Sequence, residues 1–168
     1  ERPDIVRGRF ADCKDAARPA KAFAARAKCR VLCALRRGPA GVNNINRAIE
    51  DILFPNRRGE FYDHRVILIT TNNYETNLFN GDVGICLRSE GSTHGTTAWF
   101  PGDDPDDPRP FHPAALPAHE SAFAMTVHKA QGSEFDEVWL QLPRRDNRVL
   151  SRELLYTGIT RARHAVHV

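Results

Sequence analysis

The sequence contains no apolar run that approaches the length of a membrane span, which takes about 20 consecutive apolar residues. It also lacks the basic segment followed by a hydrophobic segment that marks a signal peptide. The chain has 168 residues and begins at Glu1 rather than at Met, and we therefore expect it to be a piece of a longer protein. This length suits one domain with a small insertion.

Cysteines are few, and their spacing is irregular. Cys13, Cys29, Cys33 and Cys86 do not form the pattern of a disulfide framework, so we expect reduced thiols in a cytosolic protein. Cys29 and Cys33 flank an apolar segment that predicts a strand, and along a strand the two thiols would lie roughly 13 Å apart. This separation is too large for two ligands of one tetrahedral metal ion, and we predict no metal site.

The net charge of +3 is unevenly distributed. Residues 1–60 contain 14 Lys and Arg against 7 Asp and Glu, whereas residues 61–168 contain 10 against 14. A basic segment indicates a polyanionic partner such as nucleic acid, although a solvated surface can have the same composition. The aspartates at 103–107 alternate with prolines, which is typical of a solvated loop rather than of a metal-binding loop.

One stretch combines a buried strand with a loop rich in polar groups. Residues 123–127 are apolar or β-branched and predict a strand. The segment 128–134, His-Lys-Ala-Gln-Gly-Ser-Glu, is polar almost throughout, and residues 138–142 predict a second strand. Functional groups of α/β domains collect on such loops at the edge of the sheet.

A second stretch, residues 153–163, reads Glu-Leu-Leu-Tyr-Thr-Gly-Ile-Thr-Arg-Ala-Arg. In this order and near this separation, the two stretches resemble the last two motifs of superfamily 1 helicases, Thr-x-His-x-x-x-Gly-x-Glu-Phe and Tyr-x-x-x-Thr-Arg-Ala. The form His-Lys-Ala-Gln-Gly-Ser-Glu-Phe is most similar to the RecD family, the alpha subunit of exodeoxyribonuclease V. Gln131 departs from the Lys that many relatives outside this family have.

The resemblance implies an α/β fold: a RecA-like parallel sheet flanked by helices, as in P-loop NTPases, with a small SH3-like β-barrel inserted. Residues 1–79 and 120–168 would form the second RecA-like domain of a helicase, and residues 80–119 the insertion. Short predicted strands between 82 and 118 and the turn signal Asn80-Gly81 agree with an insertion there. The strongest predicted strand, residues 65–70, would belong to the RecA-like domain.

The resemblance also implies a function. The family consists of ATP-dependent 5′→3′ DNA helicases that act on single-stranded DNA in double-strand break repair and recombination, with RecB-like and RecC-like subunits. ATP with Mg²⁺ is bound there mainly by another domain, whose P-loop has the signature Gly-x-x-x-x-Gly-Lys-Ser/Thr. This chain contains no Gly-Lys dipeptide, so we expect it to be the second motor domain only and to be inactive alone.

Site residues follow from the resemblance by position. Arg161 corresponds to the arginine that reaches the γ-phosphate, a role that suits a permanently charged, planar guanidinium. Gly132 and Glu134 lie where the family contacts the nucleotide or couples it to DNA. Thr126 and His128 lie where the family touches the DNA backbone.

Other residues have less definite roles. Asn72 and Asn73 follow the strand 65–70 and are further candidates for contact with DNA. Tyr156 could stack on a base, but its neighbours on a predicted helix favour a place in the core. Arg36 and Arg37, in a loop rich in Gly and Pro, could face phosphate or only solvent.

Capping residues predict two helices. Asn43 or Asn44 would begin a helix that runs to about Phe54, and Ser151 would begin one that runs through Arg163.

Two other classes of function compete with a motor. The chain could be a non-enzymatic module that binds nucleic acid or protein with a degenerate helicase fold, but such a module has no need of Arg161. It could also be a nuclease, but the sequence offers no coherent carboxylate cluster for two metal ions.

Overall fold

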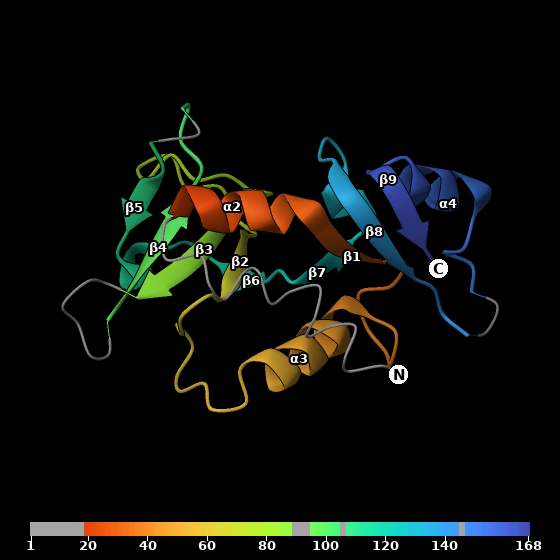
Figure 1. Cartoon of the computed structure of the whole chain (residues 1–168), viewed down its shortest axis with the longest axis horizontal. Coiled ribbons are helices and arrows are strands. Elements are labelled where there is room, and N and C mark those ends of the chain that lie inside the picture. Colours follow the sequence, from red (N-terminus) through yellow and green to blue (C-terminus); the bar gives the residue numbers. More distant parts are fainter. Residues whose placement is uncertain (1–18, 89–94, 105–106, 145–146) are drawn as a thin grey trace. The chain divides into compact units, whose positions relative to one another are not determined.

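The computed structural model describes residues 19–88, 95–104, 107–144 and 147–168. Its strands form two separate sheets, and the chain divides into two compact units (Figure 1). Among the described residues, the first unit contains 26–55 and the part from 123 onward, and the second contains 19–25 and the part between 56 and 122. The expectations for residues 1–18, Cys13 included, lie outside the described residues.

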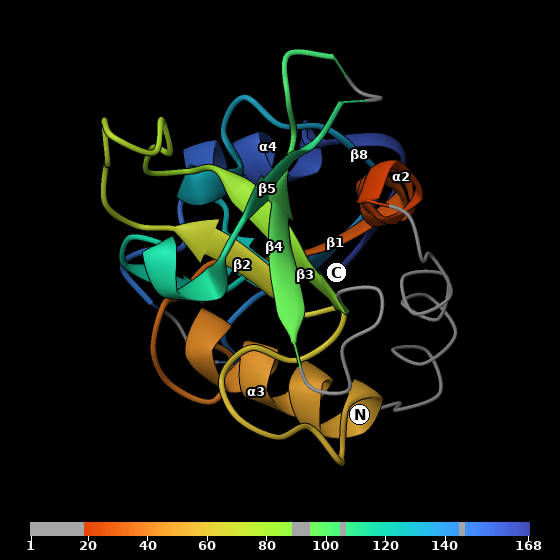
Figure 2. The ribbon, with the colours of Figure 1, turned by 90° about the vertical axis from the view of Figure 1, so that its left-hand side faces the viewer.

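The first unit is built on a parallel sheet in the order β7-β1-β8-β9. Its strands are β1 (Cys29–Cys33), β7 (Ala124–Thr126), β8 (Phe135–Gln141) and β9 (Ala162–His167). Helices α3 (Val42–Leu53) and α4 (Arg152–Ile159) lie on opposite sides of this sheet (Figures 1 and 2). The predicted α/β fold, with a parallel sheet flanked by helices, is therefore confirmed.

The strand β1 in the interior of the parallel sheet is buried on both faces. Leu32 and Cys33 have no exposed surface, and successive side chains of a strand point to opposite faces. Such burial on two faces is what covering helices impose on a parallel sheet. No helix in the described part of the chain is long and apolar enough to cross a membrane.

Helix α3 begins after Gly41 and not after Asn43 or Asn44, so the predicted cap is wrong. A Cβ on Gly41 would lie 2.5 Å from the carbonyl carbon of Arg37, so only glycine fits where the loop turns into the helix. The helix ends at the predicted place, with Phe54 as its C-cap. Its buried residues are Val42, Asn46, Ile49 and Leu53.

Asn46 connects α3 to the outer edge of the parallel sheet. Its Nδ2 donates a hydrogen bond to the carbonyl of Ala124 (3.0 Å), and its Oδ1 accepts one from the Ala124 N–H (2.7 Å). Ala124 lies in β7, which among the described strands has a neighbour on one side only. The buried amide of Asn46 therefore satisfies two backbone groups that a further strand would otherwise pair.

Helix α4 has the predicted N-cap but is shorter than predicted. The Ser151 hydroxyl accepts a hydrogen bond from the N–H of Leu154 (3.1 Å), which confirms the cap. The helix stops at Ile159, because the chain joins the sheet as β9 from Ala162. Arg161 consequently lies in the turn between α4 and β9 instead of on a helix.

The second unit is built on an antiparallel sheet in the order β5-β4-β3-β2-β6. Its strands are β2 (Val66–Ile69), β3 (Val83–Arg88), β4 (Thr96–Phe100), β5 (Arg109–Phe111) and β6 (His119–Ser121). β2 lies outside the predicted insertion and β6 crosses its end, so the bounds 80–119 are too narrow for this sheet. The description of the insertion as SH3-like stays a prediction.

The prediction that residues 65–70 belong to the RecA-like domain is wrong, and it failed because the residues of β2 are all apolar. Val66–Ile69 are buried throughout, a pattern typical of the centre of a parallel sheet. Here the antiparallel sheet is covered on both faces. Ile67 and Ile69 pack with Leu78 and Phe100, and a second cluster joins Ala22 of α2 (Pro19–Lys28) to Ile85 and Leu87 of β3.

The larger segment of the second unit, residues 56–122, is inserted into the first unit at one point. Phe54, at the end of α3, and Phe123, just before β7, have ring centroids 5.8 Å apart. The chain therefore leaves the first unit after Pro55 and returns at Phe123 at nearly the same place. Residues 56–122 have the connectivity of an inserted domain.

We expect Asn46→Ala to lower the free energy of unfolding by about 2–4 kcal/mol, because it leaves two buried backbone groups of Ala124 without partners. Urea unfolding measures this change. Asn44→Ala is the matched control, since Asn44 is exposed on the same helix and its loss should change stability by less than about 0.5 kcal/mol. Equal effects of the two substitutions would contradict the role given to Asn46.

We expect residues 26–55 joined to 123–168 by a short Gly/Ser linker to keep the parallel sheet, since the two ends already lie together. Deletion of 80–118 alone should instead give an aggregating protein, because it removes β3 and leaves the apolar β2 without that neighbour. Circular dichroism and amide exchange distinguish the two results. A folded 80–118 deletion would show that the narrower bounds are correct.

Candidate functional site

The register between β8 and β9 brings the two sequence motifs together. Phe135, the first residue of β8, pairs with Ala162, the first residue of β9. The N–H of Phe135 also donates a hydrogen bond to the carbonyl of Arg161 (2.9 Å). Residues 132–134 and Arg161 therefore meet at the edge of the sheet where both strands begin.

The guanidinium of Arg161 is held by neutral oxygen atoms. Nε donates to the carbonyl of Thr157 (3.2 Å), Nη1 to the carbonyl of Ser133 (3.4 Å) and Nη2 to the hydroxyl of Thr160 (3.3 Å). Two of these acceptors belong to the last turn of α4 and its cap, where a positive charge also interacts favourably with the helix dipole. Among the described residues no carboxylate pairs with Arg161, and its charge stays available for an anionic ligand.

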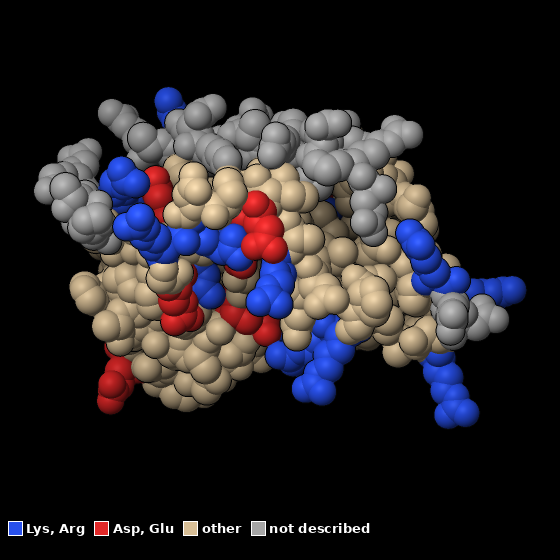
Figure 3. Space-filling model, turned by 90° about the horizontal axis from the view of Figure 1, so that it is seen from below, with Lys and Arg blue, Asp and Glu red and all other residues tan. Residues whose placement is uncertain are grey.

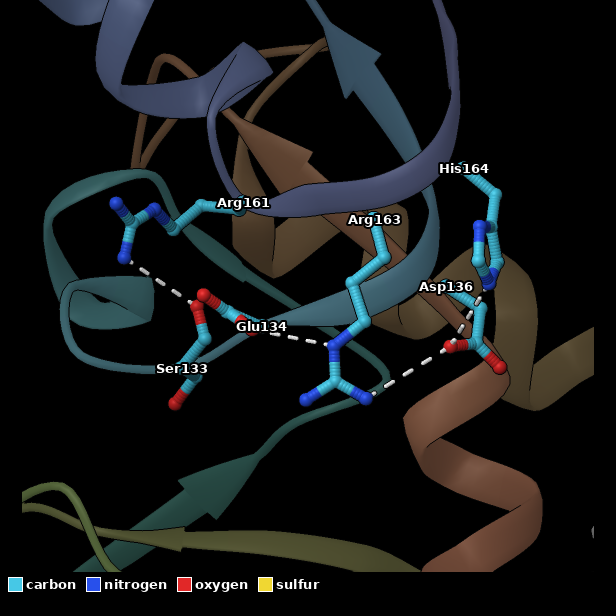
Figure 4. Close-up of polar contacts among 6 residues, drawn as sticks. All are labelled: Ser133, Glu134, Asp136, Arg161, Arg163 and His164. Atoms are coloured by element: carbon cyan, nitrogen blue, oxygen red, sulfur yellow. Dashed lines mark hydrogen bonds and ion pairs between the residues drawn. The ribbon is translucent and has the colours of Figure 1, made fainter.

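Gly132 and Glu134 lie near Arg161, and their contact with a nucleotide stays a prediction. Gly132 has φ +82°, a left-handed conformation that favours glycine, and the space around it is open. Glu134 is exposed and forms an ion pair with Arg163, whose Nε lies 3.1 Å from Oε2 of Glu134 (Figure 4). The structure thus brings the exposed Gly132 and Glu134 near the half-buried Arg161.

Arg163 belongs to this site, although the sequence interpretation gave it no role. It lies in β9 rather than on a helix, and its Nη1 is 4.0 Å from Oδ1 of Asp136. His164 is the other partner of Asp136, with Nε2 at 3.9 Å from Oδ1. The only sequence signal for these contacts was a basic pair, Arg163 and His164, after one motif and an acidic pair, Glu134 and Asp136, after the other.

Thr126 and His128 lie at the opposite end of the strands from Arg161. Thr126 pairs with Cys33, which in turn pairs with Gln141, the last residue of β8. The length of β8 separates this end from Arg161 by roughly 20 Å at the rise of an extended strand. His128 is exposed in a short 3₁₀ helix (His128–Ala130), whose Lys129 N–H donates to Oγ1 of Thr126 (3.3 Å). The structure does not bring these residues to Arg161.

Asn72 and Asn73 lie in the second unit and hold the shape of their own loop. Oδ1 of Asn72 accepts from the N–H of Asn80 (2.8 Å). Oδ1 of Asn73 accepts from the N–H groups of Glu75 (2.9 Å) and Thr76 (3.1 Å). A structural role of these side-chain oxygens is thus visible, and contact with DNA stays a prediction.

Tyr156 is not a core residue, so that prediction is wrong. Its side chain is 70% exposed, whereas Leu154 on the same helix is 6% exposed. Because α4 packs on the sheet through the side that carries Leu154 and Gly158, Tyr156 is turned toward solvent. The other interpretation, stacking on a base, stays open.

Charged residues and thiols outside this site provide no further candidate functional site among the described residues. In the largest group of charges on the face drawn in Figure 3, basic and acidic residues are mixed. Arg36 and Arg37 are exposed in the loop after β1. Burial raises the pKa of the Cys33 thiol to about 12, so this thiol is unreactive at neutral pH. Within the described residues, His, Cys, Asp and Glu form no group of three or more suited to a metal ion.

Comparison with known proteins places these motifs in a family. Residues 121–168 match the UvrD-like helicase C-terminal domain. The RecBCD enzyme subunit RecD of Mycolicibacterium smegmatis is 40% identical over 143 residues, which cover 83% of this chain and 24% of that protein. The RecD subunit of Haemophilus influenzae is 39% identical over 145 residues, with 83% and 21% covered. The chain thus matches less than a quarter of the length of these relatives.

Solved structures support the same fold. A Pif1 helicase from Bacteroides, in complex with ADP-AlF3 and single-stranded DNA, has a TM-score of 0.53 at 15% identity. The match covers 99% of this chain and 45% of that one. At this identity the similarity establishes the fold alone.

We expect Tyr156→Ala to change the free energy of unfolding by less than about 0.5 kcal/mol, because the side chain is largely exposed. Leu154→Ala, two residues earlier on the same helix, should lower it by about 2–4 kcal/mol, since it opens a cavity under α4. Chemical unfolding of both variants measures the difference. A decrease of more than about 1.5 kcal/mol in the free energy of unfolding of Tyr156→Ala would indicate that Tyr156 packs in the core.

Proposed function

Because this chain belongs to the RecD family of helicases, we propose that it is the second motor domain of a longer ATP-dependent 5′→3′ DNA helicase. The first unit, with its parallel sheet, would be the RecA-like part, and residues 56–122 would be the domain inserted into it. The parent protein would act in double-strand break repair and recombination. RecB-like and RecC-like subunits would be its partners, as the name of the relatives, RecBCD enzyme subunit, suggests.

The observation that supports this proposal most directly is the state of Arg161. Its backbone is fixed by hydrogen bonds to Gly158 (3.3 Å) and Phe135 (2.9 Å), while its guanidinium contacts neutral acceptors only, within the described residues. A charged group on a rigid base with exchangeable neutral partners suits phosphate oxygens, which give stronger, charge-assisted hydrogen bonds. Arg161 would thus reach a γ-phosphate held by another domain.

The position of Arg161 in the sheet agrees with a nucleotide held elsewhere. Ligands of open parallel sheets usually bind at the carboxyl ends of the strands. Arg161 lies at the opposite end, where β8 and β9 begin. ATP and Mg²⁺ would therefore be bound mainly by the P-loop domain of the parent protein, while Arg161, Gly132 and Glu134 would contribute from this side.

Single-stranded DNA would contact Thr126 and His128 at the carboxyl end of β7. In the second unit it would contact Asn72 and Asn73. Residues 127–134 run from the end of the strands that carries Thr126 to the end that carries Arg161, because β7 and β8 are both parallel to β1. One segment would therefore have one end at each ligand. A contiguous connection of this kind is a physical means to couple ATP turnover to movement along DNA.

A binding module with a degenerate helicase fold is the competing proposal. The same segment would then bind DNA without any need for Arg161. Turnover of ATP by the parent protein, and its dependence on Arg161, distinguishes the two.

We expect Arg161→Ala in the parent protein to lower the ATPase kcat by a factor on the order of 10³–10⁵, the contribution of an arginine finger. Nucleotide affinity should change little, since another domain holds the nucleotide and Arg161 acts on the charge of the transition state. Arg161→Lys should also fail, because an ammonium group cannot reproduce the planar fork. Steady-state ATPase assays with saturating single-stranded DNA, beside nucleotide titrations, measure both effects.

Arg152→Ala is the control, since Arg152 is exposed at the start of the same helix and has no contact with the Arg161 site. Arg163 is unsuitable as a control because it contacts Glu134. This chain alone provides the baseline, as it lacks the P-loop. Turnover by Arg161→Ala within a few-fold of the unmodified protein would contradict the proposal.

A further inference from the structure

The site has a potential conflict of charges. Glu134 stands between Ser133, whose carbonyl accepts from the Arg161 guanidinium, and Phe135, whose N–H donates to the Arg161 carbonyl. A carboxylate at this position has the guanidinium of Arg161 within reach. An ion pair between them would occupy the charge that Arg161 needs for phosphate.

The structure shows a different pairing. Glu134 is bound by Arg163, and Arg161 has only neutral partners among the described residues. In Figure 4 the Glu134 side chain lies between those of Arg161 and Arg163, and its ion pair is with Arg163. Arg161 and Arg163 flank the Glu134 carboxylate. Arg163, which is not expected to reach the nucleotide, forms the ion pair with it.

A β-bulge in β9 makes this arrangement possible. Phe135 pairs with Ala162 and Glu137 pairs with Ala165, so two residues of β9, Arg163 and His164, stand opposite Asp136 alone. On a regular strand these two side chains would point to opposite faces of the sheet. The bulge directs both toward Asp136, at 4.0 Å and 3.9 Å, as bulges near functional sites often redirect side chains.

We propose that Arg163 is a positioning residue that holds the Glu134 carboxylate away from Arg161. It thereby keeps the Arg161 guanidinium on neutral acceptors, which a phosphate can replace. Asp136 and the bulge fix Arg163 in the orientation that this requires. The proposal rests on the proposed function, because it concerns the readiness of Arg161 for a nucleotide.

The contact is suited to be exchanged. The side chains of Arg163 and Glu134 are 55% and 58% exposed, and exposed ion pairs are weak and are screened by salt. Arg163 can therefore hold Glu134 without preventing Glu134 from turning to a bound nucleotide. A buried pair at the same place would lock the carboxylate.

The test uses the parent protein and steady-state ATPase with saturating single-stranded DNA. Arg163→Ala should lower kcat about two- to fivefold, the range that corresponds to an exposed ion pair between Glu134 and Arg161. Arg163→Lys should keep most of the activity, because a single ammonium can also hold one carboxylate oxygen. The double variant with Arg163→Ala and Glu134→Gln should recover the kcat of Glu134→Gln alone, since an uncharged amide no longer competes for Arg161.

His164→Ala is the matched control, because it removes the other partner of Asp136 and leaves the pair of Glu134 with Arg163 intact. The proposal is overturned if Arg163→Ala has unchanged kcat, or if Glu134→Gln does not rescue it. If Arg161→Ala is as active as the unmodified protein, the proposed function fails first. A dead Arg161→Ala together with a fully active Arg163→Ala refutes only the present inference.

A second measurement requires no activity. In this 168-residue chain, the Nε–Hε resonance of Arg161 in a ¹H–¹⁵N spectrum reports its hydrogen-bond partners. Arg163→Ala should move this resonance, and addition of Glu134→Gln should return it toward its original position. A resonance that does not respond to Arg163→Ala would contradict the inference, whatever the kinetics show.

Discussion

The pairing of β8 with a parallel neighbour on each side is the constraint on which the site depends. β1 pairs with the later part of β8, from Glu137 to Gln141, and β9 with its first part, from Phe135 to Trp139. Parallel pairing fixes which residues meet, since a slip of one residue would turn every side chain to the other face. The register thus sets Arg161 beside Ser133 and Glu134, and it keeps Thr126 at the far end.

Much of the first unit could be predicted from the sequence because its signals are local. Apolar runs predicted the strand between Cys29 and Cys33 and those at 123–127 and 138–142, and Ser151 predicted the start of α4. The sequence could not indicate the sheet to which Val66–Ile69 belongs, because an apolar run reports burial on two faces and nothing about its neighbours. The insertion bounds failed for the same reason: pairing of β2 with β3 and β6 is a long-range property.

The candidate site shows the same division. Gly132, Glu134 and Arg161 come from the two motifs and lie near one another in the structure, while their contact with a nucleotide stays a prediction. Arg163 was missed because its contact depends on a bulge, and a bulge is a feature of register between strands. Tyr156 was assigned to the core from its apolar neighbours, but which side of α4 faces the sheet is decided by Gly158, where a Cβ would lie 3.0 Å from Leu140.

The insertion of residues 56–122 at one point has a consequence for synthesis on the ribosome. β1 is made before residues 56–122, yet its partners in the parallel sheet are β7 and β8, which follow the whole of this segment. At 5–20 residues per second, that segment takes roughly 3–13 s to emerge. The antiparallel sheet can therefore fold first, while the apolar β1 waits without its partners. Throughout that interval, the backbone groups of β1 lack their strand partners and are accessible for pairing with other nascent chains.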